Sequence, residues 1–141
     1  MVISCSSATT APEFQDAVEV GGIELRAEVN REDATMLRVA ITLKNTTPEP
    51  ARLTLSPCVH VLLFSPTQRV WEGANFGGCP DLWPEVTLQP GESSIRTHVV
   101  ALEAAESRRE RPAPGLYEAA VRVETAEPSR VMTLSAGGLT L

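Results

Sequence analysis

Hydrophobic and polar residues alternate along much of this chain, with the period of two that half-buried β-strands show. In GIELRAEVN, residues 22–30, apolar side chains occupy every second position and charged side chains fall between them. The segment TMLRVAITLKN, residues 35–45, repeats this pattern. Both segments therefore predict strands with one face buried and the other face in solvent.

Further strands are predicted along the rest of the chain, separated by turn signals that contain proline or glycine. They fall in residues 51–56, 58–65, 69–73, 85–102 (two strands broken at Pro90-Gly91), 115–124 and 130–141. Gly137-Gly138 marks a bulge or turn in the last of them. Because no helical segment of crossover length connects these strands, the expected fold class is all-β. We expect an antiparallel, Ig-like two-sheet β-sandwich of about seven to nine strands.

The length of the chain indicates how many domains it forms, and its net charge limits the class of partner. At 141 residues the chain fits one domain, and we expect a flexible N-terminal tail over residues 1–20 and a single sandwich domain over residues 21–141. The net charge of -6 argues against nucleic-acid binding, because a basic face supplies most of that affinity. No apolar run approaches the length of a membrane span.

The first residues carry a short motif that bears on location. Val2-Ile3-Ser4-Cys5 is similar to a bacterial lipobox, in which an aliphatic and a small residue precede a lipidated cysteine. The small and polar residues that follow would suit a flexible tether. We therefore expect Cys5 to be a lipidation site and the protein to be extracytoplasmic, lipid-anchored or periplasmic, with membrane contact only through that anchor. The alternative is an incidental N-terminal cysteine.

The other two cysteines are candidates for a disulfide. A bond between Cys58 and Cys79 would close a loop of about 20 residues, which stabilises a fold by roughly 3 kcal/mol in the chain-entropy treatment. Structural disulfides persist in oxidising compartments, so the expected bond and the expected location support each other. The alternative is a pair of reduced, buried thiols.

Four segments of the chain resemble the BsuPI-type intracellular proteinase inhibitor family. They are LRVAITLKNTTPEPARLTL, VWEG, LQPGES and PGLYEAAVRV, within a similarity that covers roughly residues 22 to 125. The resemblance implies an Ig-like sandwich and recognition of a protein. The expected lipid anchor and cysteine pair depart from that family and put an intracellular role in doubt. No inhibitory residue of the family maps onto a position of this sequence.

Catalytic chemistry has little support in the sequence. The two histidines, His60 and His98, stand in mid-strand positions outside any recognisable nucleophile, phosphate-loop or zinc signature. We therefore expect no catalytic residues, no enzymatic activity and no cofactor. One alternative is a small copper or zinc envelope protein, in which Cys58, His60, Cys79 and His98 would form a tetrahedral site.

The segment WEGANFGGCPDLW, residues 71–83, holds three of the six aromatic residues of the chain. Trp71, Phe76 and Trp83 bracket Cys79, and loops at the ends of sandwiches commonly carry recognition. We therefore place the candidate binding surface on these three rings, and the expected function is a non-enzymatic protein-binding module of the cell envelope with an unknown protein partner. The alternative is that the rings fill one end of the core.

Overall fold

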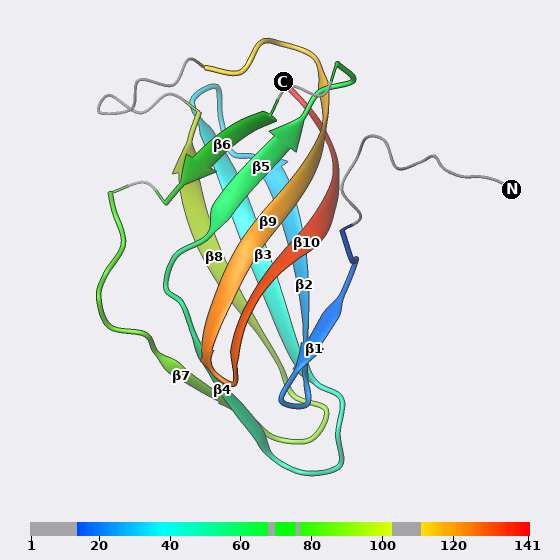
Figure 1. Ribbon diagram of the computed structural model, residues 1–141, viewed down its shortest axis with the longest axis vertical. Helices are drawn as coiled ribbons and strands as arrows, with labels where there is room; N and C mark the ends of the chain where they lie inside the picture. The colour runs from blue at the N-terminus through cyan, green and yellow to red at the C-terminus, as the bar shows by residue number, and fades with distance from the viewer. Residues whose placement is uncertain (1–13, 68–69, 76, 103–110) are drawn as a thin grey trace, which may run out of the picture.

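The computed structural model describes residues 14–67, 70–75, 77–102 and 111–141. Within these residues the chain forms ten strands in two antiparallel sheets that enclose one hydrophobic core (Figure 1). The predicted all-β two-sheet sandwich is therefore confirmed. The described residues contain no helix of a length and apolarity that could cross a membrane.

The first sheet has four strands in the order β1-β2-β3-β8. These strands are β1 (Val18–Val20), β2 (Ile23–Arg31), β3 (Met36–Asn45) and β8 (Ser93–Ala101). β2 and β3 form a long hairpin in which Leu25 lies opposite Leu43 and Val29 lies opposite Val39. All four side chains are buried, so the alternation in the sequence sets which face of this sheet meets the core.

The second sheet has six strands built around β9. Its members are β4 (Ala51–Leu55), β5 (His60–Phe64), β6 (Val70–Ala74), β7 (Glu85–Leu88), β9 (Leu116–Glu127) and β10 (Ser129–Thr140). β10 follows one edge of β9, while β5 and β4 share the other edge, and β6 and β7 extend the sheet beyond them. The pairing of β9 with β10 shifts register between Ser135 and Gly137, which places a bulge where the glycine pair predicted one.

The core lies between the inner faces of the two sheets and consists of aliphatic side chains. The largest fully buried residues are Ile23, Leu25, Leu37, Val39, Ile41, Leu43, Leu53, Val59, Val61, Leu63, Leu102 and Leu134. Within each strand these buried residues occupy alternate positions, because successive side chains of a strand point to opposite faces of the sheet. The burial of these side chains is the main favourable term in the stability of the sandwich.

Single bridges join the two sheets at both of their open sides. Gln15 forms a parallel bridge with Leu134 of β10, and its carbonyl accepts a hydrogen bond of 2.9 Å from the Ser135 N–H. On the opposite side Asn75, directly after β6, forms an antiparallel bridge with Val100 of β8. These bridges pair backbone groups that the edge strands would otherwise leave open.

The predicted boundary between tail and domain at Gly21 is wrong. β1 already begins at Val18, and its three residues pair with Ile23–Leu25 of β2. Further upstream, the ring of Phe14 lies 5.3 Å from the ring of Phe64, measured between centroids. The described residues form ten strands, one more than the expected upper number, because β1 lies within the predicted tail.

Asn45 holds the end of β3 and the following turn in place. Its side chain is 1% exposed. The amide nitrogen donates to the carbonyls of Glu49 at 2.7 Å and Leu88 at 3.0 Å. The amide oxygen accepts from the N–H of Thr47 at 2.9 Å and from its hydroxyl at 2.8 Å. One buried side chain thus fastens the β3–β4 connection to β7.

Candidate functional site

The connection between β6 and β7 is an exposed loop beside the sandwich, and it runs along the left side of Figure 1 in green. We name its described part, Gly77–Pro84, the pinned loop. Seven of these eight residues are exposed, and only Trp83 is half-buried. Gly77 and Gly78 have φ values of 86° and 92°, which glycine adopts far more readily than other residues do.

A disulfide between Cys58 and Cys79 fixes the middle of the pinned loop, and the predicted bond is therefore present. The two Cα atoms lie 5.6 Å apart, and the bonded residues are 21 positions apart in the sequence. Cys58 lies in the connection between β4 and β5, so the disulfide ties the loop to the body of the second sheet. A disulfide fits an oxidising compartment.

Asn75 anchors the chain just before the pinned loop. Its side-chain oxygen accepts from the Val59 N–H at 2.9 Å, and its side-chain nitrogen donates to the Pro57 carbonyl at 3.1 Å. The same nitrogen lies 3.2 Å from Nδ1 of His98 on β8. The Asn75 carbonyl also accepts from the Gly78 N–H at 3.4 Å, which closes the turn that leads into the loop.

The far end of the loop has an anchor as well. The Leu55 N–H donates to the carbonyl of Pro84 at 3.1 Å, immediately before β7 begins. All three anchors therefore meet the chain between Leu55, the last residue of β4, and Val59, the residue before β5. A backbone held at its two ends and in its middle loses less conformational entropy when a partner binds.

Leu82 is the exposed apolar side chain of the pinned loop. It is 82% exposed, the highest fraction among the large hydrophobic residues that the structure describes as exposed. The sequence prediction missed it and named aromatic residues instead. Its position between Pro80 and Pro84, three residues after Cys79, is the local signal that could have pointed to it.

The structure separates the three predicted aromatic residues. Trp71 lies opposite the buried Leu63 and therefore faces the core, where its ring packs as a partly buried member. The ring lies over Gly73, because a Cβ atom on this glycine would clash with it. The same Cβ atom would lie 2.9 Å from Cγ1 of Val100, so the glycine and the ring lie beside β8. Of the three aromatic residues only Trp83 lies in the pinned loop, and Phe76 lies outside the described residues. The predicted lipidation site, Cys5, also lies outside them. For Trp71 the geometry favours the packing interpretation.

His98 lies on the inner face of β8, opposite Val39. Burial lowers the pKa of its imidazole below the ordinary value of 6.5. Its Nε2 atom is buried and has no hydrogen-bond partner among the described residues, as is also true of Nε1 of Trp71. The neutral imidazole is therefore the form that this position favours.

The four predicted metal ligands do not meet as a tetrahedral set. His60 lies on the outer face of β5, where its Nδ1 is 3.4 Å from Oε1 of Glu72, and Arg122 donates to the same oxygen at 2.8 Å. Both cysteine sulfurs are bonded to each other, and a disulfide sulfur is not a thiolate ligand. The described part of the chain holds no group of three His, Cys, Asp or Glu side chains placed to bind a metal ion.

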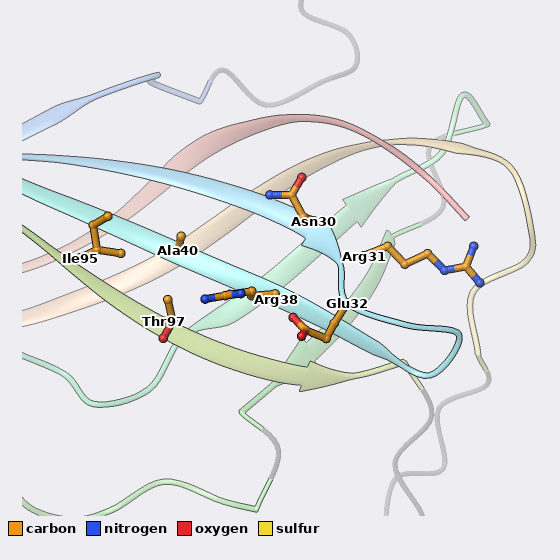
Figure 2. Close-up of a pocket in the computed structure, with 7 residues that line it drawn as sticks. All are labelled: Asn30, Arg31, Glu32, Arg38, Ala40, Ile95 and Thr97. Atoms are coloured by element: carbon orange, nitrogen blue, oxygen red, sulfur yellow. The ribbon is translucent and has the colours of Figure 1, made fainter.

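A shallow hollow of about 450 Å³ lies on the outer face of the four-stranded sheet (Figure 2). It is lined by Asn30, Arg31, Glu32, Arg38, Ala40, Ile95 and Thr97. Arg31 points away from the other side chains in Figure 2, and the charged side chains of the lining are all exposed. The hollow therefore lacks the enclosed polar groups that small-molecule sites use for orientation.

No protein-family model matches this chain, and no curated protein matches it. Among solved structures, the chain is similar to the Pseudomonas fluorescens alkylpurine DNA glycosylase AlkC, with 13% identity, a TM-score of 0.40, and coverage of 82% of this chain and 30% of the glycosylase. It is also similar to a Listeria innocua β-glucosidase, with 22% identity, a TM-score of 0.38, and coverage of 84% and 16% of the two chains.

A third similar structure is the PCuAC domain of PmoF2 in its apo form, with 15% identity and a TM-score of 0.37 over 86% of this chain and 92% of that domain. The chain thus spans less than a third of the glycosylase and less than a fifth of the glucosidase. At these identities and scores, the three matches say nothing about what this chain does.

Proposed function

We propose that this protein is a non-enzymatic protein-binding module of the bacterial cell envelope, and that its partner docks on the pinned loop, Gly77–Pro84. The observation that carries the proposal is the 82% exposure of Leu82 in a segment with three anchors. An exposed apolar side chain on a fixed backbone is well suited to fill a pocket on a partner, because little ordering is needed on binding.

The cell envelope is proposed from the cysteines. The Cys58–Cys79 disulfide suits an oxidising compartment, and the similarity of residues 2–5 to a lipobox suggests a lipid tether at Cys5. The pinned loop would then be presented by a domain that is tethered through its N-terminal segment.

A proteinase is the partner class that we propose, because of the resemblance to the BsuPI-type inhibitor family together with the character of the loop. Proteinases bind an extended segment and place one of its side chains in a specificity pocket. Pro80 and Pro84 fix φ on either side of Leu82, and the disulfide restrains the adjoining backbone at Cys79. We expect Leu82 to occupy an apolar pocket of the enzyme.

The experiment compares the wild-type protein with Leu82→Asp and with Leu116→Asp as a matched control. Leu116 is also exposed, at 63%, but it lies on β9 outside the pinned loop. Each protein is assayed for inhibition of two serine proteinases, one that prefers apolar side chains and one that prefers basic side chains, and for partner capture from an envelope extract.

We expect the wild type and Leu116→Asp to inhibit the apolar-specific proteinase and to retain the same envelope protein, and Leu82→Asp to lose both properties. Denaturation midpoints should agree for all three, because both leucines are exposed. Equal behaviour of Leu82→Asp and the wild type, or no binding by the wild type in either assay, would refute the proposal.

A further inference from the structure

We propose that His98 makes the pinned loop sensitive to acid, because protonation of its imidazole breaks the hydrogen bond that ties Asn75 to β8. This inference rests on the proposed binding function of the loop and adds regulation to it. The side-chain amide of Asn75 has a fixed orientation, so Nδ1 of His98 can act only as the acceptor in this hydrogen bond.

The orientation of the Asn75 side chain follows from its two backbone partners. The Val59 N–H can only donate, so the atom 2.9 Å from it must be the side-chain oxygen. The Pro57 carbonyl can only accept, so the atom 3.1 Å from it must be the side-chain nitrogen. Exchanging the two atoms would place donor against donor and acceptor against acceptor.

The nitrogen that donates to Pro57 is also the atom 3.2 Å from Nδ1 of His98. Because this nitrogen is a donor, Nδ1 must accept and cannot carry a proton. The neutral imidazole therefore carries its proton on Nε2. A second proton could add only at Nδ1, where it would point at the N–H of Asn75 and abolish the bond.

The surroundings of His98 reinforce the neutral form. Val39 lies opposite His98 on β3, and Arg96 is the charged neighbour on the same face of β8. The inner face of β6 carries Trp71 and Gly73, and Gly73 lies beside Val100 of β8. Burial is the cause of its lowered pKa, and no carboxylate contributes to the shift. Asp81 of the pinned loop is exposed. No anion among these groups would stabilise an imidazolium.

The sign of the pH effect follows from the lowered pKa. Well above pH 6.5 His98 is neutral in the folded and unfolded chain alike, and the Asn75 bond is intact. As the pH falls from 6.5 toward the folded-state pKa, the unfolded chain takes up the proton more readily, so the local structure loses stability. Protonation in the folded state then costs the bond itself.

The bond is coupled to the loop through the backbone of Asn75. This residue bridges Val100 of β8, and its carbonyl accepts from Gly78, the second residue of the pinned loop. Cys79 stays bonded to Cys58 at any pH in this range. Acid should therefore loosen the start of the loop while its middle stays attached.

The test uses the free protein, without a partner. NMR signals of the two imidazoles and of the Gly77 and Gly78 amides are followed from about pH 7.5 to about pH 4.5, which brackets the ordinary histidine pKa. Amide exchange is measured across the same range and corrected for its intrinsic pH dependence. We expect the loop signals to move with the His98 midpoint, and exchange to rise about five- to tenfold, as for the loss of one hydrogen bond.

Two variants make the outcome decisive. His98→Asn keeps an acceptor near the position of Nδ1 but cannot be protonated, so it should abolish the pH response of the loop. His60→Asn changes the other histidine and should leave the response in place. Loop signals that do not follow His98, or a response that survives in His98→Asn, would overturn the inference. Because no partner is present, these results are independent of the Leu82 experiment.

Discussion

The Cys58–Cys79 disulfide offers the sharpest test of how the pinned loop is held. The perturbation is replacement of both cysteines by serine in a Cys5→Ser background, which removes the third thiol and prevents mispairing. The bonded residues are 21 positions apart, and a closed loop of this size lowers the entropy of the unfolded chain by an amount worth about 3 kcal/mol. We therefore expect the free energy of unfolding to fall by about 3 kcal/mol.

The domain should nevertheless still fold. The core lies between the two sheets, and the Asn75 and Pro84 hydrogen bonds do not depend on the disulfide. Small domains are stable by roughly 5–15 kcal/mol, so a loss of this size leaves the folded state populated. The urea dependence of unfolding should steepen, because an unfolded chain without a crosslink exposes more surface.

The assay is urea denaturation of the Cys5→Ser parent and of the triple variant, followed by fluorescence and extrapolated to water. The parent is also measured with reductant, and it should then shift toward the variant. A difference below about 1 kcal/mol would refute the reasoning from chain entropy. Free thiols in the denatured, unreduced parent would show that the two cysteines are not bonded in the protein.

Two further stability predictions follow from buried side chains. Asn45→Ala removes four hydrogen bonds and leaves the Leu88 carbonyl without its side-chain donor, so we expect the free energy of unfolding to fall by about 2–4 kcal/mol. Urea denaturation measures this loss, and the exposed Asn30→Ala should change the free energy of unfolding little. Equal losses in the two variants would contradict the role of burial. Trp71→Ala should cost about 3–5 kcal/mol because its ring packs against the core, and Trp83→Ala less than half of that. If Trp83→Ala lowered the free energy of unfolding more than Trp71→Ala did, Trp71 would again be a candidate for the binding surface.

Most of the sandwich could be predicted because its long strands repeat one pattern many times. β2, β3 and β9 each alternate over several periods, and the predicted segments 22–30, 35–45 and 115–124 coincide with them to within a few residues. β1 has only three residues, VEV, which is a little over one period and cannot be told from a tail. Its strand character comes from pairing with β2, which is a tertiary contact.

The candidate site was harder to predict, because its decisive contacts join residues that lie far apart in the sequence. The side chain of Asn75 bonds to groups 16, 18 and 23 positions away. The disulfide pairing was predictable because the chain has three cysteines and one of them stands in a lipobox-like motif. The direction of the Trp71 ring depends on its pairing with Leu63, which no local pattern around Trp71 reveals.

The anchors at the start and in the middle of the pinned loop respond to different chemistry. The disulfide at Cys79 is indifferent to pH across the range in which a histidine titrates, and only a reductant or thiol exchange breaks it. The Asn75–His98 bond is indifferent to redox conditions and depends on a neutral imidazole. In an oxidising compartment the middle of the loop therefore stays attached while its first residues respond to acid. If the disulfide were reduced, the segment between Asn75 and Pro84 would lose its covalent anchor, and a pH titration would then report general loosening as well as His98 protonation. For this reason the acid response of the loop has to be measured with the Cys58–Cys79 bond intact.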